Sequence, residues 1–138
     1  MTDQPGGGVV VDTSAAVAVI LGEDGAERIV GHLETAGTRL MSTAGRLELG
    51  IVIEARFGRA GGDAVERFLR DAAIRLVDVD ADAAERAMGA WRRYGKGRHR
   101  AALNYGDCFA YALAERSGMP LLCTGQDFAA TDLDVLPG

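Results

Sequence analysis

Four carboxylic acids stand at positions where an ionised side chain needs a partner. Asp12 ends a short β-branched run, Asp127 closely follows another apolar run, and Glu48 and Asp107 stand in segments that are otherwise apolar. A carboxylate near a hydrophobic core is costly unless it is paired, hydrogen-bonded or bound to a metal. No basic residue adjoins any of the four in the sequence. Together they therefore indicate a site for a divalent cation, which prefers oxygen ligands.

Each of these acids also has a purely structural explanation. Asp12 would cap a helix that starts at Ser14, and Asp107 would stabilise a first helical turn by about 0.3 to 1 kcal/mol. Glu48 would be the exposed flank of a helix, and Asp127 would be an ordinary turn residue. The hypothesis of a cation site therefore requires that the four acids meet in space.

Strands and helices alternate along the chain. The hydrophobic pattern predicts strands at residues 9–11, 39–42, 74–79 and 120–124, with a short fifth strand near Val135 and Leu136. Helices are predicted over residues 15–21, 24–36, 44–58, 63–73, 81–94 and 106–117. The alternation favours an α/β fold with a mostly parallel sheet of four to five strands between helices. Ligands bind outside the carboxyl ends of such strands, where Asp12 and Asp127 lie.

Two of the predicted helices carry informative patterns. In residues 44–58, Leu47, Ile51 and Ala55 recur every four residues and form one stripe, with Glu48 beside it. The helix over residues 106–117 is apolar nearly all round and should be central. Residues 61–62, both glycine, are expected to break the chain, and Gly118 is expected to end the last helix.

Composition is that of one ordinary globular domain. The chain has 138 residues, 48% hydrophobic and 25% charged, and its net charge of −5 excludes a polycationic nucleic-acid coat. Residues 1–8 are polar and glycine-rich, so we expect a flexible tail before a single domain at residues 9–138. Two isolated cysteines indicate the reducing cytoplasm. The longest apolar run is too short for a bilayer of about 30 Å, so no membrane anchor is expected.

One segment is strongly basic. Residues 88–105 contain no acid and carry five positive charges, so the rest of this −5 chain carries −10. Such segregation favours contact with RNA phosphates, and Trp91, Tyr94 and Tyr105 would stack on unpaired bases at about 1 to 3 kcal/mol each. Alternatively, Trp91 and Tyr94 pack the helix and the basic loop is only solvated. The candidate RNA-binding residues are Arg92, Arg93, Lys96, Arg98 and Arg100.

Four motifs resemble those of one known family. They are Val-Val-Asp-Thr-Ser-Ala at 10–15, Ser42 followed six residues later by Glu48, Leu-Asn-Tyr-Gly-Asp at 103–107, and Leu-Cys-Thr-Gly-Gln-Asp-Phe at 122–128. In order and spacing the set resembles the PIN-domain ribonucleases, and most nearly the VapC-type toxins of bacterial type II toxin–antitoxin pairs. The resemblance runs from about Val9 to the C-terminus.

This resemblance implies a PIN-like three-layer α/β/α sandwich with ribonuclease activity. It implies an endoribonuclease dependent on Mg²⁺ or Mn²⁺, in which metal-activated water hydrolyses the phosphodiester. A cognate VapB-type antitoxin and a homodimer are also implied, with residues 14–21 and 29–33 as candidate surfaces. The acids carried over as catalytic residues and metal ligands are Asp12, Glu48, Asp107 and Asp127, and the supporting residues are Thr13, Ser14, Asn104 and Thr124.

Two other interpretations use the same acids. A phosphatase with an Asp nucleophile would need a second Asp two residues after Asp12, where Ser14 stands. A receiver domain would need a lysine at a strand end, whereas the only lysine is Lys96 in the basic loop. A non-catalytic binding module with a PIN fold is the third class, against which the presence of all four acids argues.

Overall fold

Five short parallel strands form one sheet with β1 at its centre. The computed structural model describes residues 7–137, so the predicted tail lies almost entirely outside the described residues. The strand order is β3-β2-β1-β4-β5. The strands are β1 (Val9–Val11), β2 (Arg39–Ser42), β3 (Arg75–Val77), β4 (Leu121–Cys123) and β5 (Val135–Pro137). The chain first builds outward from β1 through β2 and β3 and then returns to the other side of β1, which makes the β1–β4 boundary a topological switch point.

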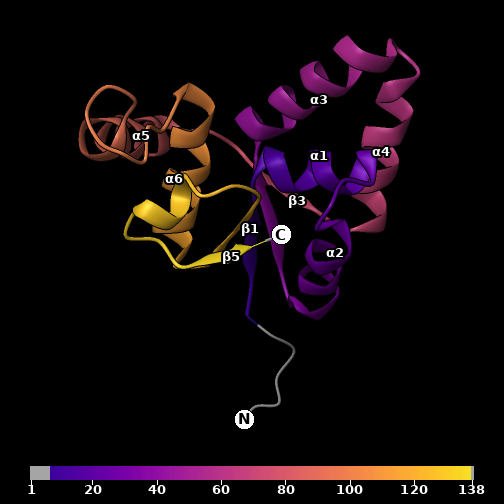
Figure 1. Cartoon of the computed structure of the whole chain (residues 1–138), viewed down its shortest axis with the longest axis horizontal. Helices are drawn as coiled ribbons and strands as arrows, with labels where there is room; N and C mark the ends of the chain where they lie inside the picture. Colours follow the sequence, from indigo (N-terminus) through magenta and orange to yellow (C-terminus); the bar gives the residue numbers. More distant parts are fainter. Residues whose placement is uncertain (1–6, 138) are drawn as a thin grey trace.

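Within residues 7–137, six helices lie on the two sides of this sheet. Alternate side chains of a strand point to opposite faces, so Val10 packs toward α6 whereas Val9 and Val11 pack toward α1 to α4. Figure 1 shows the result, with α3 and α4 forming one arm of the molecule and α5 and α6 the other. The predicted three-layer α/β/α sandwich is therefore confirmed. The helices are α1 (Thr13–Leu21), α2 (Ala26–Thr35), α3 (Thr43–Phe57), α4 (Gly61–Asp71), α5 (Ala81–Tyr94) and α6 (Tyr105–Ser117), with a short 3₁₀ helix at Phe128–Ala130.

Helix α6 is the central helix that its composition predicts. Its residues Tyr111, Ala112 and Ala114 are buried, and it ends at Gly118, whose positive φ of 72° suits glycine. Within residues 7–137, no helix has both the length and the hydropathy that crossing a bilayer demands.

Two details differ from the sequence expectations. The stripe on α3 faces solvent, with Leu47 64% and Ile51 60% exposed, whereas Leu49 and Ile53 are fully buried. The expected chain break at residues 61–62 is wrong, because Gly61 is the first residue of α4. A Cβ on Gly61 would lie 2.9 Å from Cγ2 of Ile53, so glycine is what allows α4 to approach α3 closely.

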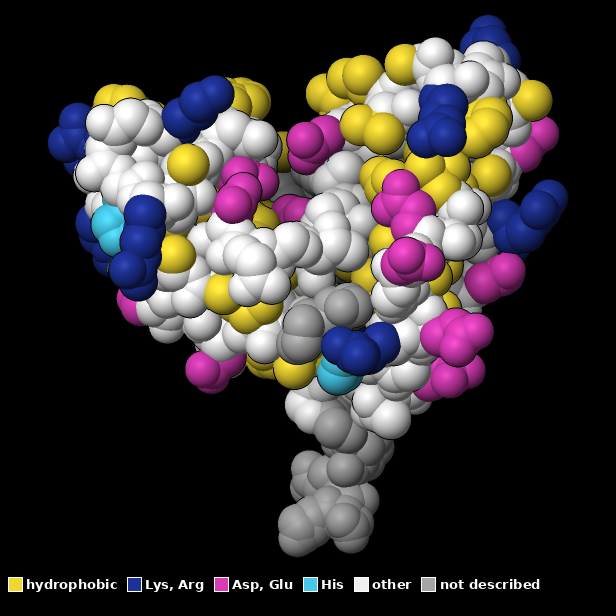
Figure 2. Space-filling model, viewed as in Figure 1, with side chains coloured by type: hydrophobic (Ala, Val, Ile, Leu, Met, Phe, Trp, Pro, Cys, Tyr) yellow, Lys and Arg dark blue, Asp and Glu magenta, His cyan; other side chains and the backbone are white. Residues whose placement is uncertain are grey.

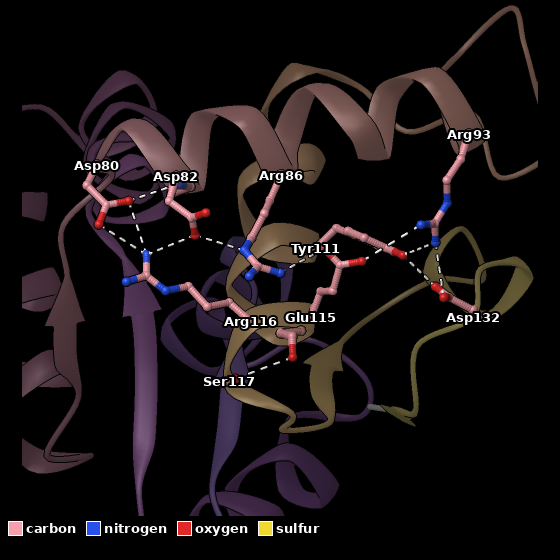
Figure 3. A network of polar contacts seen from close by, with 11 residues as sticks. Asp80, Asp82, Arg86, Arg93, Tyr111, Glu115, Arg116, Ser117 and Asp132 are labelled. Carbon is pink, nitrogen blue, oxygen red and sulfur yellow. Dashed lines mark hydrogen bonds and ion pairs between the residues drawn. The ribbon is translucent and has the colours of Figure 1, made fainter.

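A chain of polar contacts joins α5 to α6 and to the loop after the 3₁₀ helix (Figure 3). Arg116 pairs with Asp80 at 3.1 Å, and Arg93 pairs with Asp132 at 3.0 Å. The Tyr111 hydroxyl donates to Asp132 and accepts from Arg93. Exposed ion pairs stabilise a fold by at most about 1 kcal/mol, so the buried tyrosine is the member of this network with most effect on stability.

We therefore predict that Tyr111→Phe lowers the free energy of unfolding by about 1 to 2 kcal/mol, because it removes the hydroxyl between two charged groups but keeps the buried ring. Urea denaturation measures the change. Glu66→Gln, which breaks only the exposed pair of Glu66 with Arg46, should change little and serves as the control. Equal effects of the two substitutions would contradict the prediction.

Candidate active site

The switch point between β1 and β4 places Asp12 beside the end of β4. Asp12 follows β1 directly, its backbone N–H donates to the Leu122 carbonyl at 2.9 Å, and its side chain is buried. Its Oδ2 accepts from the backbone N–H of Ser14 at 3.0 Å and from the Ser14 hydroxyl at 2.6 Å. The same Ser14 oxygen accepts from the Thr124 N–H at 3.0 Å. Ser14 therefore joins the two strand ends and fixes the Asp12 carboxylate.

Glu48 reaches the site from α3. The Thr13 hydroxyl donates to Glu48 Oε1 at 2.9 Å and lies 3.3 Å from the Gly45 carbonyl oxygen. On its other side the Glu48 carboxylate lies against Gly106, where a Cβ would stand 2.9 Å from Oε1 and 3.0 Å from Oε2. Thr13 and Gly106 thus hold Glu48 between α1 and α6, next to Asp107.

Asp107 lies in the first turn of α6 and takes part in its cap. Its Oδ2 accepts from the Asn104 N–H at 3.0 Å, and Asn104 Oδ1 accepts from the Asp107 N–H at 2.9 Å. The structural explanation is therefore right for Asp107, and also for Asp12, which caps α1. It does not exclude the cation site, because each cap uses only Oδ2, and no hydrogen bond among the described residues reaches Oδ1 of either aspartate.

These side chains surround a cavity of about 260 Å³. Figure 2 shows Asp and Glu side chains gathered in the notch between the two arms of the molecule. The cavity lining contains no Lys, Arg or His. Its members are Asp12, Thr13, Ser14, Val17, Glu23, Glu48, Val52, Asp107 and Thr124.

Two acids depart from the sequence prediction. Asp127 is exposed and outside the lining, although its charge contributes to raising the pKa of Asp107. Glu23 lines the cavity and was missed, because it follows the end of a helix rather than the end of a strand. Its only sequence signal is Gly22 before it, whose positive φ of 66° turns the chain at the end of α1.

Burial and neighbouring negative charge raise the pKa values of Asp12 and Asp107. Burial raises the pKa of Asp12, and the nearby charge of Glu48 adds to this. Burial, together with the charges of Asp12, Asp127 and Glu48, raises the pKa of Asp107 to about 6. The cavity thus has a surplus of negative charge that no basic side chain in its lining offsets.

This donor set fits a hard divalent cation. Carboxylate and hydroxyl oxygens are the ligands that Mg²⁺ and Mn²⁺ prefer, and the cavity offers few others. Among residues 7–137, no three His, Cys, Asp or Glu side chains already stand at the spacing of a metal shell. Carboxylates that repel one another stand apart, and a cation between them removes the repulsion.

The family follows from comparison with known proteins. Residues 9–133 match the family model of the PIN domain. Over 125 residues the chain is 55% identical to VapC ribonuclease Mb0640 of Mycobacterium bovis, which covers 91% of this chain and 95% of that one. The chain belongs to the VapC group of PIN-domain proteins. Ribonuclease VapC of Mycolicibacterium smegmatis is 54% identical, covering 91% of this chain and 97% of the relative.

Solved structures share the fold of this PIN domain. VapC20 of Mycobacterium tuberculosis superposes with a TM-score of 0.76 at 18% identity, covering 93% of this chain and 98% of that one. VapBC2 of Rickettsia felis, solved bound to a DNA fragment from its promoter, gives a TM-score of 0.74 at 12% identity, covering 95% of this chain and 98% of that one.

The phosphoryl-transfer alternatives lose support from the geometry of this PIN domain. Ser14, which stands where a phosphatase would have its second aspartate, is bonded to Asp12 and Thr124. Lys96, which a receiver would need at a strand end, lines a different cavity between α5 and α6.

The basic segment is divided between two roles. Arg93 is held by Asp132 and by the rings of Tyr94 and Tyr111, and so takes part in the α5–α6 network rather than standing free in solvent. The other four candidates, Arg92, Lys96, Arg98 and Arg100, are exposed at the end of α5 and in the following loop.

We predict that Gly106→Ala weakens metal binding about ten-fold without destabilising the protein. The new methyl group displaces the flexible Glu48 carboxylate, whereas alanine suits a helix better than glycine. Titration with Mn²⁺ followed by calorimetry, together with thermal unfolding, tests this. Gly89→Ala on α5, where a Cβ meets open space, is the matched control. Unchanged Mn²⁺ affinity in Gly106→Ala would refute the assigned place of Glu48.

The raised pKa of Asp107 predicts a pH-dependent difference between the metal-free protein and its Asp107→Asn variant. A carboxyl with a raised pKa stabilises the fold only while it is protonated, so the wild type loses this contribution as pH rises from about 4 through about 6. Asparagine keeps the cap and does not titrate. The melting temperature of Asp107→Asn relative to wild type should therefore increase between about pH 4.5 and about pH 7. A difference that stays constant over this range would show that Asp107 is not crowded.

Proposed function

We propose that this protein is a VapC-type toxin that acts in the cytoplasm as an endoribonuclease dependent on Mg²⁺ or Mn²⁺. The observation that carries the proposal is the cavity at the β1–β4 switch point, where Asp12, Glu48 and Asp107 meet without a basic side chain. The relatives that are 54 to 55% identical over 125 residues are named ribonucleases, which supports RNA as the substrate.

The ligands proposed for the cation are Asp12, Glu48 and Asp107, with Asp127 at the edge of the site. When bound, the cation lowers the pKa of a water molecule and offsets charge on the phosphate. The chain's own part is to hold the oxygens. Ser14 and the Asn104 N–H fix Oδ2 of Asp12 and of Asp107, which leaves both Oδ1 atoms for binding, and Thr13 orients Glu48.

The Thr13 and Ser14 hydroxyls donate hydrogen bonds to the Glu48 and Asp12 carboxylates, and Ser14 Oγ also accepts from the Thr124 N–H, so both hydroxyls are engaged in orienting the proposed ligands. No histidine is among the described residues that line the cavity. This arrangement favours hydrolysis by water over a covalent intermediate. Phosphate contacts are assigned to Arg92, Lys96, Arg98 and Arg100 on the arm formed by α5 and α6.

A VapB-type antitoxin is the partner of this toxin, as the VapBC complexes of related fold suggest. We assign it the groove of about 510 Å³ between α1, α2 and α4, where Val19, Ile20 and Val30 are half-buried and Arg39 and Asp71 add charge. This groove includes parts of both segments predicted as partner surfaces. For the homodimer, the exposed Leu47 and Ile51 of α3 supply an apolar face.

Asp12→Asn should abolish cleavage, because the amide still caps α1 but removes a negative charge from the cation site. We expect a loss of at least about a hundred-fold in the rate at which total RNA is cut with Mg²⁺ or Mn²⁺, and no cutting by the wild type with EDTA. Asp24→Asn, an exposed acid outside the cavity, is the control. Failure of the wild type to cut with either metal would favour the non-catalytic binding module.

A further inference from the structure

A second, larger cavity lies beside the acidic one. It has a volume of about 720 Å³ between α5 and the start of α6. Met88 and Trp91 line it from α5, Tyr105 and Phe109 from α6, and Lys96 from the basic loop. Its lining includes no carboxylate, unlike the acidic cavity.

Two aromatic rings in this cavity are exposed yet held in place. Tyr105 is 81% exposed, and its ring packs edge-on against Phe109 at 4.9 Å between centroids. Trp91 is 38% exposed and lies beneath the guanidinium of Arg98 at 4.8 Å. Gly95 lies so close that a Cβ would stand 2.4 Å from Cδ1 of Trp91. Exposed aromatics held by packing form surfaces on which a planar ligand can stack without a large loss of side-chain entropy.

The two cavities meet at the start of α6. Asn104 lines the aromatic cavity, and its side chain caps the helix in which Asp107 lines the acidic one. Asn104 is also bonded directly to Asp107, because its N–H donates to Asp107 Oδ2 at 3.0 Å. Tyr105 and Asp107 are two residues apart and face opposite sides of the helix, so a base on Tyr105 and a phosphodiester at the acids would lie on either side of the first turn of α6.

The charges around the aromatic cavity favour a polyanion with planar groups. Lys96 is in the lining, Arg98 covers Trp91, and Arg92 and Arg100 are exposed nearby in the sequence. Stacking faces together with cations are the combination that binds single-stranded nucleic acid. Bases in a duplex do not offer these faces, so the ligand must contain unpaired nucleotides.

We propose that the cavity between α5 and α6 is a nucleobase-binding subsite, in which an unpaired base of the RNA substrate stacks on Tyr105 and Trp91. Lys96 contacts the phosphate of that nucleotide, and the adjoining phosphodiester lies at the acids. This subsite rests on the proposed ribonuclease function and adds the requirement for a single-stranded, base-bearing segment next to the cleaved bond.

Binding without cleavage tests the subsite directly. The probes are a short fluorescein-labelled single-stranded RNA of mixed sequence and a ribose-phosphate oligomer of the same length without bases. Fluorescence anisotropy is measured on Asp12→Asn protein in EDTA, with Tyr105→Ala, Trp91→Leu or Tyr105→Phe added. Phe57→Ala, which removes an exposed aromatic outside both cavities, is the matched control.

We expect Tyr105→Ala to weaken binding of the base-bearing RNA by about 5- to 150-fold, Tyr105→Phe and Phe57→Ala to leave it unchanged, and binding of the abasic oligomer to stay the same throughout. Because Tyr105 is exposed, Tyr105→Ala should fold and can test the subsite even if Trp91→Leu does not fold. Equal losses on both probes, or no loss on either, would overturn the subsite.

The oligomeric state distinguishes RNA from a second copy of this chain as the occupant of the cavity. Light scattering should give the same molar mass for Tyr105→Ala and for the unsubstituted chain. A dimer that becomes a monomer in Tyr105→Ala would show that a second copy of the chain fills the cavity, and would overturn the proposal. If wild-type protein cuts total RNA while base-dependent binding is absent, only the subsite fails. If it cuts no RNA with either metal, the ribonuclease function itself fails.

Discussion

Mutual repulsion of Asp12, Glu48 and Asp107 is the constraint that the rest of this PIN domain must accommodate. Parallel pairing of β1 with β4 fixes Asp12 at the switch point, and α3 and α6 bring the other two acids to it. The groups that hold these carboxylates are hydroxyls and backbone N–H groups, which orient an oxygen without cancelling its charge. The proposed divalent cation would supply the positive charge that these hydrogen bonds do not.

The acids serve the fold and the site at the same time. Asp12 caps α1 and Asp107 completes the cap of α6, so both stand at helix N-termini, where the helix dipole favours negative charge. The caps make the crowded carboxylates less costly in the absence of metal. They also fix the direction of each Oδ1, so the proposed cation site would be partly organised by the same bonds that begin the helices.

Local patterns in the sequence were sufficient for most of the fold. A β-branched run marked β1, and an apolar segment without a polar face marked α6 as central. On α3, however, Leu47 with Ile51 and Leu49 with Ile53 have the same four-residue spacing. Periodicity cannot say which pair is covered, because the choice depends on the close approach of α4 at Gly61. The site was predictable as a set of acids, whereas the bond from Thr124 to Ser14 spans 110 residues and needed the tertiary structure.

A protein proposed to bind both a cation and a polyanion needs its negative and positive side chains on separate surfaces. This chain places Asp12, Glu48 and Asp107 around the acidic cavity and the five cations of residues 88–105 on α5 and the loop that follows. Arg93 is one cation of the basic segment that is not free to contact a ligand, because it holds α5 to Asp132 and Tyr111. Of the remaining cations, Lys96 lines the apolar cavity and Arg98 covers Trp91 in its lining. In the proposed function, attraction for phosphate and discrimination between paired and unpaired bases could therefore change independently of the acids proposed to hold the metal.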